Sequence, residues 1–238
     1  MPRPRPEILA LAAAWAVVAE LAIAALLLGV AIIRWAPPED LPWTPLRLED
    51  PPGLATGFKL AMAGADPGRC RAILAEGGVS LTEATDQAVG HCELSGAVRL
   101  QGRAPALSPA APVMSCQQAL AYSLWMRHAV EPAARAELGE PIAEVEHYGT
   151  FACRNIAGSP WRSQHAHANA IDVAAFRTAS GRRVSVLRDF ADPGPKGRFL
   201  RRTRDGACHW FSAVLSPDYN GAHRDHFHLD RGRYRACR

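Results

Sequence analysis

The chain has 238 residues, of which 48% are hydrophobic and 21% are charged, and its formal net charge is +4. This length suits one core-forming domain, and the apolar content excludes a wholly disordered chain. A mean hydropathy of -0.09 excludes a protein with many membrane-spanning helices. Arginine supplies most of the positive charge, since Lys59 and Lys196 are the only lysines. The sequence has no basic stripe with interleaved aromatic side chains, so it does not indicate a nucleic-acid partner.

One long apolar segment, residues 8–33, lies near the N-terminus, and Glu20 is its single charged residue. It exceeds the roughly 20 residues that cross a bilayer as a helix. Arg3 and Arg5 precede it, so we expect residues 1–7 in the cytoplasm and the rest of the chain outside. The alternative is a cleaved signal peptide, whose apolar part is usually only about 7–15 residues long. The sequence therefore predicts a single-pass inner-membrane protein with its soluble part in the periplasm.

Residues 34–66 begin with a Pro-rich, acidic stretch and indicate an extended linker to a soluble domain of residues 67–238. Hydrophobic periodicity, capping residues and glycines predict the elements of this domain. In chain order these are a helix from Cys70 that ends at Gly77, a strand at 97–100, a helix of about 14 residues with Ser115 as its N-cap, strands at 143–148, 171–176 and 183–187, a helix at 198–214, and a strand at 226–230. Helices mixed with short strands indicate an α+β fold.

Six cysteines all follow the apolar segment: Cys70, Cys92, Cys116, Cys153, Cys208 and Cys237. None of them has the CxxC spacing of a zinc ribbon or a redox site, and disulfides are typical of exported proteins. We therefore expect three disulfides, with buried free thiols as the alternative. Six cysteines allow 15 pairings, and the sequence does not choose among them.

Six of the nine histidines lie between His165 and His228, mostly in two short stretches. The first runs from His165 to Asp172, which opens an apolar strand, and the second contains His226 and His228. Side chains two apart on a strand leave the same face, so both of these imidazoles face one side. A loop histidine, a strand aspartate and a strand histidine can converge on one ion, as in catalytic zinc sites. Unrelated surface histidines are the alternative interpretation.

The two histidine motifs resemble those of the LAS-type zinc metallopeptidases, which include D-alanyl-D-alanine carboxypeptidases and murein endopeptidases. From Cys70 to Arg238 the chain resembles more closely the bacterial extensin-like C-terminal domain family. The blocks that carry this resemblance are CRAIL, SCQQALAYSLW, YGTFACRN, SQHAHANAIDVAAF, GACHWF, VLSPDYNGAHRDHFHLD and the terminal ACR.

The resemblance to LAS enzymes implies a small, mainly antiparallel sheet with flanking helices and one bound Zn²⁺. It implies His165, Asp172 and His228 as the metal ligands. It also implies His226 as base or electrostatic stabiliser and His223 as an assisting group. The weakest transfer is Arg154, which falls where related peptidases can carry a substrate-binding arginine.

The first motif departs from the family pattern at three positions that are not expected ligands. Gln164 and Ala168 stand where Glu and Gly are usual, and His167 is an additional imidazole. Ala168 occupies a loop position that favours the conformational freedom of glycine. His167 replaces a ligand only if this loop shifts.

Together these features predict a membrane-anchored periplasmic zinc peptidase that acts on peptidoglycan peptides, as a carboxypeptidase or an endopeptidase. Two other hypotheses are a non-catalytic module that binds cell wall and retains the metal site, and an envelope scaffold held by disulfides. The scaffold hypothesis expects the histidines to be dispensable. It also expects the domain to unfold when Cys116 or Cys153 is removed.

Overall fold

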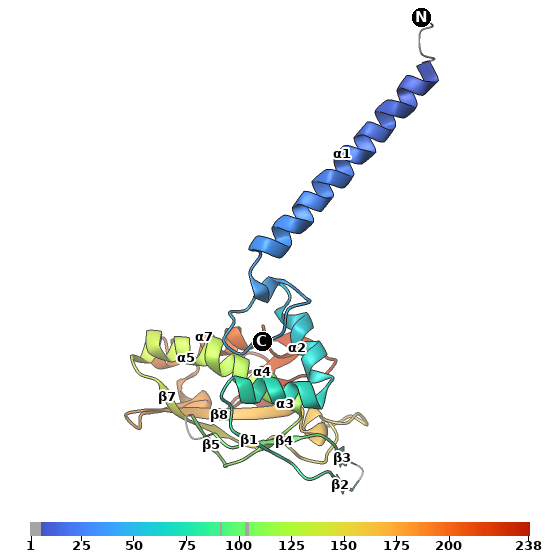
Figure 1. The fold of residues 1–238 in the computed structure, drawn as a ribbon. Helices are drawn as coiled ribbons and strands as arrows, with labels where there is room; N and C mark the ends of the chain where they lie inside the picture. Colours follow the sequence, from blue (N-terminus) through green and yellow to red (C-terminus); the bar gives the residue numbers. More distant parts are fainter. Residues whose placement is uncertain (1–5, 91, 103–104) are drawn as a thin grey trace, which may run out of the picture.

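The computed structural model describes residues 6–90, 92–102 and 105–238 (Figure 1). It has an α+β fold with mostly antiparallel sheets and one N-terminal apolar helix, which confirms the predicted class. Arg3 and Arg5, from which the membrane orientation was predicted, lie outside the described residues. The elements are α1 (Pro6–Trp35), η1 (Pro38–Asp40), α2 (Thr56–Gly64), α3 (Pro67–Glu76), β1 (Leu81–Glu83), β2 (Gln87–Val89), β3 (Cys92–Leu94), β4 (Val98–Leu100), β5 (Ala106–Ser108), β6 (Val113–Met114), α4 (Cys116–Trp125), η2 (Met126–Val130), α5 (Glu131–Ala133), η3 (Ala134–Leu138), β7 (Ile142–His147), η4 (Gln164–His167), β8 (Ala170–Thr178), β9 (Arg183–Ser185), α6 (Val186–Asp189), α7 (Pro195–Ala207), β10 (Ala213–Leu215), η5 (Gly221–His223), β11 (Phe227–Asp230) and β12 (Ala236–Cys237).

Helix α1 extends away from the domain as one straight rod (Figure 1). Its stretch Ala13–Trp35 is long and apolar enough to cross a membrane, and none of it is buried against the domain. Both a membrane anchor and a signal sequence have such a helix.

The structure differs from the expected linker, because much of 34–66 packs onto the domain. Leu46 and Leu48 are buried, and α2 lies against α4 through the buried side chain of Leu60. Lys59, the single charged residue of α2, is also buried. Its ammonium donates hydrogen bonds to the carbonyl of Pro38 and to Thr44 Oγ1. Leucine burial therefore folds a segment whose prolines and acidic residues had indicated an extended chain.

The main sheet has the strand order β12-β10-β11-β8-β7-β5, with β9 paired to β8. Its described pairings are antiparallel except β5 with β7 and β10 with β12. One face packs against helices through a cluster of aromatic rings, in which Trp125 of α4 contacts Phe176 of β8 and Phe211. Phe176 also contacts Phe199 of α7. Figure 1 shows these helices on the side of the domain where α1 arrives.

The helix predicted from Ser115 begins as expected, since Ser115 Oγ accepts a hydrogen bond from the amide of Gln118 at 3.2 Å. It runs further than the expected end near residue 129. Two π-helical segments, η2 and η3, carry it to Leu138. Gly139 ends it with a φ of 75°, the left-handed conformation that favours glycine at a helix C-terminus.

Two predicted elements in the C-terminal half are wrong in their bounds. The helix expected at 198–214 ends at Ala207, and Val214 lies in β10, where it pairs with β11 and β12. The strand expected at 183–187 ends at Ser185, because Asp189 Oδ2 accepts from the Ser185 amide and starts the short helix α6. Pairing with distant strands in the first case, and a local side-chain contact in the second, override the periodicity of the sequence.

The expected disulfides are confirmed, and they pair as Cys70–Cys116, Cys92–Cys153 and Cys208–Cys237. The first joins α3 to the start of α4. The second fastens β3 to the loop after β7, and the third ties the end of α7 to β12. Among the described residues there is no free cysteine.

Candidate metal centre

Strands β8 and β11 bring the two histidine stretches together. They pair antiparallel, with His228 directly opposite Asp172. The neighbouring side chains Ile171, Val173 and Phe227 are fully buried in the core. Because side chains alternate along a strand, Asp172 and His228 lie on the sheet face opposite the core helices.

A tight turn supplies the third residue, His165, which is 3% exposed. The turn η4 begins at Ser163, whose Oγ accepts from the His165 amide at 3.3 Å. The carbonyl of His165 accepts from Ala152 at 3.1 Å, which ties the turn to the loop after β7. The imidazole is thus held rigidly above the pair of strands.

Three acceptor atoms of these residues meet at one point, all within 4.8 Å of one another. His165 Nε2 lies 3.1 Å from Asp172 Oδ2 and 3.2 Å from His228 Nδ1. His228 Nδ1 lies 2.9 Å from Asp172 Oδ1. The predicted ligand trio therefore assembles in the folded chain.

The other nitrogen of each imidazole is oriented by an oxygen atom. His165 Nδ1 lies 3.3 Å from the carbonyl of Thr150, and His228 Nε2 lies 2.9 Å from Asp230 Oδ2. Both oxygens can accept from these nitrogens, and in the tautomer in which each ring donates outward, its other nitrogen turns a lone pair toward Asp172. Two such lone pairs and a carboxylate could together hold a cation, and outer hydrogen bonds of this kind are typical of histidines that bind metals.

The ionisation of the trio agrees with a site for positive charge. Burial alone raises the pKa of Asp172, but hydrogen bonds from His165 and His228 outweigh it and hold this pKa far below its usual range. Burial also lowers the pKa of His228, whereas hydrogen bonds with Asp172 and Asp230 prevail and raise it to about 9. A proton on His228 thus occupies the position that a metal ion would take.

The donor set and spacing fit a zinc ion. Two histidine nitrogens and one carboxylate are a usual catalytic zinc set, which leaves a further position open. At zinc–ligand distances of about 2.1 Å, tetrahedral ligand atoms lie about 3.4 Å apart. The observed separations of 2.9, 3.1 and 3.2 Å need only small outward shifts.

His226 lies just before β11 rather than on it, yet it reaches the same site. Its Nε2 is 3.7 Å from Asp172 Oδ1. Its Nδ1 lies 2.9 Å from Asp225 Oδ1, and the ring packs edge-on against Tyr148. Tyr148 also donates to Asp225 at 3.4 Å. With Nδ1–H donated to Asp225, Nε2 is left as a proton acceptor beside the trio.

His223 forms the outer part of the cluster. Its ring stacks near those of His226 and His228, with centroids 5.2 and 6.0 Å apart, and Nδ1 lies 2.7 Å from Asn220 Oδ1. Burial, followed by repulsion from these two imidazoles, lowers the pKa of His223 to about 4. At neutral pH it is therefore an uncharged imidazole, suited to hydrogen bonding with a substrate.

The remaining predicted positions have different outcomes. Arg154 is exposed beside Cys153, and no described contact brings it to the trio, so its role stays a prediction. His167 is exposed and does not join the described ligand group. Ala168 has a φ of 49°, which confirms that its position favours glycine. Gln164 is engaged elsewhere, since its Oε1 accepts from Asn169 at 2.9 Å.

Sequence reasoning missed the groups that orient the histidines, namely Thr150, Asp225, Asp230, Tyr148 and Asn220. Asp225 directly precedes His226 and Asp230 follows His228 by two residues, and this closeness in sequence is a signal that could have found them. The Thr150 carbonyl has no such signal, because any residue offers a carbonyl and only the fold brings this one to His165.

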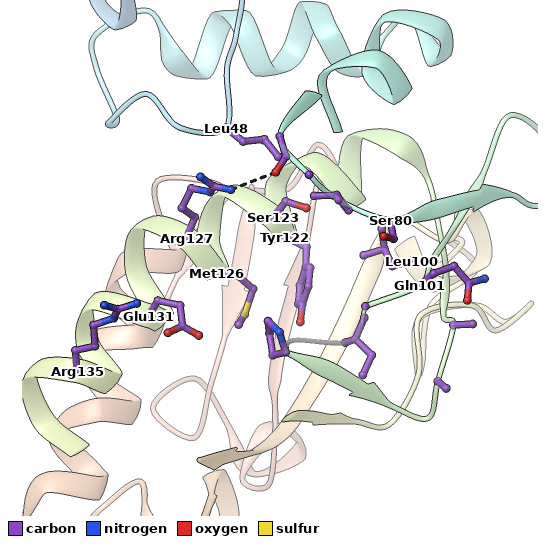
Figure 2. A pocket seen from close by; sticks show the side chains of 18 residues that line it. Leu48, Ser80, Leu100, Gln101, Tyr122, Ser123, Met126, Arg127, Glu131 and Arg135 are labelled. Carbon is purple, nitrogen blue, oxygen red and sulfur yellow. Dashed lines mark hydrogen bonds between the residues drawn. The ribbon is translucent and has the colours of Figure 1, made fainter. Parts of the chain in front are cut away.

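A separate cavity of about 830 Å³ lies between α4 and the segments around Ser80 and Leu100 (Figure 2). Tyr122 is buried there, its hydroxyl has no hydrogen-bond partner among the described residues, and burial raises its pKa. None of the predicted site residues lines this cavity. The candidate site is therefore the histidine cluster.

The family described as Extensin-like protein C-terminus matches residues 68–238, which include every residue of the cluster. The chain belongs to this family. No curated protein and no solved structure matches it. The match to the extensin-like family covers most of the chain after α1. The name of the family states no activity, so the chemistry must be argued from the site.

Proposed function

We propose that this extensin-like protein is a zinc-dependent peptidase that hydrolyses peptide bonds of peptidoglycan, as a carboxypeptidase or an endopeptidase. Helix α1 anchors it in the inner membrane, and the domain faces the periplasm. The convergence of His165, Asp172 and His228 lone pairs beside the proton acceptor His226 carries the proposal.

The reaction class follows from the chemistry of this cluster. Zinc supplies Lewis-acid chemistry when bound: it polarises a peptide carbonyl and lets water act as a nucleophile near neutral pH. His226 Nε2 would accept the proton that the attacking water loses and return it to the leaving amine nitrogen, or it would stabilise negative charge that develops on the carbonyl oxygen. Asp225 holds the tautomer of His226 that this role needs.

The substrate class rests on three features taken together. The site motifs resemble those of LAS-type peptidases, several of which act on murein peptides. Three disulfides are typical of proteins outside the reducing cytoplasm. An apolar helix before the domain would keep it at the membrane, where cell-wall peptides are within reach.

The experiment measures zinc content and peptide release from purified muropeptides with the full chain in detergent. We expect one zinc per chain in the wild type and a large loss of zinc in His165→Ala and Asp172→Ala. His226→Gln should retain zinc but lose most hydrolysis, because acid–base groups contribute about 10²- to 10⁴-fold to such rates. His209→Gln, an exposed histidine outside the cluster, is the matched control and should behave as wild type.

Absence of zinc from the wild type, with both alanine variants unchanged, would contradict the proposal. Zinc binding with tight muropeptide affinity but no release would instead favour the non-catalytic cell-wall-binding function.

A further inference from the structure

Helix α2 is apolar on both faces: Leu60 and Ala63 are buried in the core, yet large apolar side chains also lie on its exposed face. Its only charged residue, Lys59, points inward and is 5% exposed. Phe58 and Met62, four residues apart on one face, are 56% and 51% exposed. Leu54, in the turn before α2, is 93% exposed and extends the same spacing. We call Leu54, Phe58 and Met62 the α2 patch.

The α2 patch is a second apolar face of this helix, whereas a surface helix normally carries polar and charged side chains on the side away from the core. Around the patch, Gly57 and Ala61 are also exposed, so no charge interrupts it on α2. Contiguous exposed apolar side chains mark surfaces that contact a membrane or another protein.

The chain itself limits how far the α2 patch can lie from the end of α1. Pro38 comes three residues after Trp35, so their Cα atoms are at most about 11 Å apart. Lys59 of α2 donates a hydrogen bond to the carbonyl of Pro38, and a second one reaches Thr44 Oγ1 at 2.6 Å. The contact fixes α2 next to the foot of α1, as Figure 1 shows.

We propose that the α2 patch inserts into the headgroup region of the bilayer that α1 crosses. This inference rests on the proposed membrane anchor. Trp43, which is 62% exposed in the loop between α1 and α2, joins the contact, as does Trp35 at the end of α1. Tryptophans at this depth are typical of membrane interfaces. Apolar helix faces that lie in the interface plane bind there through their buried area.

The docking gives the domain one orientation. Helix α2 packs on α4, and α4 covers the sheet face opposite Asp172 and His228. With α2 on the bilayer, the histidine cluster therefore faces away from the membrane and toward the cell wall.

Photo-crosslinking in lipid nanodiscs with the full chain tests the contact. Four variants each carry a photoreactive residue: Phe58→p-benzoylphenylalanine and Met62→p-benzoylphenylalanine in the α2 patch, Leu21→p-benzoylphenylalanine in α1, and Val89→p-benzoylphenylalanine in β2. Val89 is exposed at the end of the domain opposite α1 and is the matched control (Figure 1). We expect lipid adducts at positions 21, 58 and 62 that exceed the adduct at 89 several-fold.

Two outcomes would overturn the docking while leaving the anchor intact. Lipid adducts at position 21, together with a lipid-adduct yield at position 58 no higher than that at position 89, would mean that the domain does not touch the bilayer. Protein adducts at 58 would mean that a second copy or another protein covers the patch. A lack of lipid adducts at position 21 would instead reject the anchor itself, and the zinc assay remains independent of all three results.

Discussion

Asp230 is a small but decisive part of the candidate centre, although it contacts no predicted substrate position. It is 6% exposed, and its carboxylate accepts from His228 through Oδ2 and from the Gly232 amide through Oδ1. When a metal ion takes the place of the proton on Nδ1, His228 donates only outward to Asp230, and its Nδ1 lone pair is directed at the point where Asp172 and His165 meet. The residue thus controls the tautomer of a ligand.

We therefore expect Asp230→Asn to lower zinc affinity by about tenfold while leaving the fold intact, since second-layer carboxylates typically contribute 10- to 100-fold. Asparagine has the size of aspartate and keeps one acceptor oxygen, so the loss of zinc affinity measures the effect of the negative charge. Competition with a chromophoric chelator measures the affinity. Asp205→Asn, on an exposed part of α7, is the control. Equal affinities for wild type and Asp230→Asn would show that Asp230 does not tune the ligand.

At the scale of elements, much of the candidate site was predictable because its residues lie in two stretches that are each short in sequence. The spacing from His165 to Asp172 is a turn followed by a strand, and the alternation of the strand around His228 buries its neighbours Phe227 and Leu229. The direct pairing of Asp172 with His228 was not readable, because strand register depends on contacts between distant segments.

The same limit explains the elements that were wrong. Local periodicity extended the helix from 198 to 214, whereas Cys208 is bound to Cys237 and the Ser212 amide donates to the Asp230 carbonyl. Both partners are remote in sequence. Likewise, burial of Leu46 and Leu48 against the domain outweighed the prolines around them.

Glu146 of β7 forms ion pairs with Arg177 of β8 and Arg183 of β9, and this network should make the free energy of unfolding depend on pH. Arg183 and Arg177 donate to Glu146, and their hydrogen bonds and charge outweigh burial and lower its pKa. A lowered pKa contributes stability above the ordinary glutamate pKa near 4.5, and this contribution is lost as the pH falls through the folded-state value.

Glu146→Gln should accordingly reduce the free energy of unfolding by about 1 kcal/mol at pH 7, and by progressively less below pH 4.5. Urea unfolding at several pH values measures this difference. Glu76→Gln, at an exposed helix end, removes the same charge and should have little effect. A destabilisation by Glu146→Gln that persists unchanged at low pH would argue against an ionic origin.

At the scale of the whole molecule, the disulfides join segments that are distant in the sequence. Cys70–Cys116 spans 46 residues and links α3 to α4, the helix on which the sheet packs. Cross-links of this span limit the unfolded chain and typically contribute about 2–4 kcal/mol.

The double variant Cys70→Ala/Cys116→Ala should therefore lose about 3 kcal/mol of unfolding free energy, a large part of the stability of a domain this size. Chemical denaturation under oxidising conditions measures the loss. Wild-type protein unfolded with a reductant present should be destabilised at least as much, because all three cross-links then open. A double variant as stable as the oxidised wild type would show that packing alone holds α3 on α4.

The hydrogen bond from Lys59 to Pro38 has a consequence for where the protein can work. It shortens the flexible connection after α1 to a few residues, so the linker between α1 and the domain is very short. A domain of this size is roughly 40 Å across. An anchored chain could therefore reach only material within about one domain diameter of the bilayer. Its working layer would be the wall nearest the membrane, and peptides in more distant layers would stay beyond its reach.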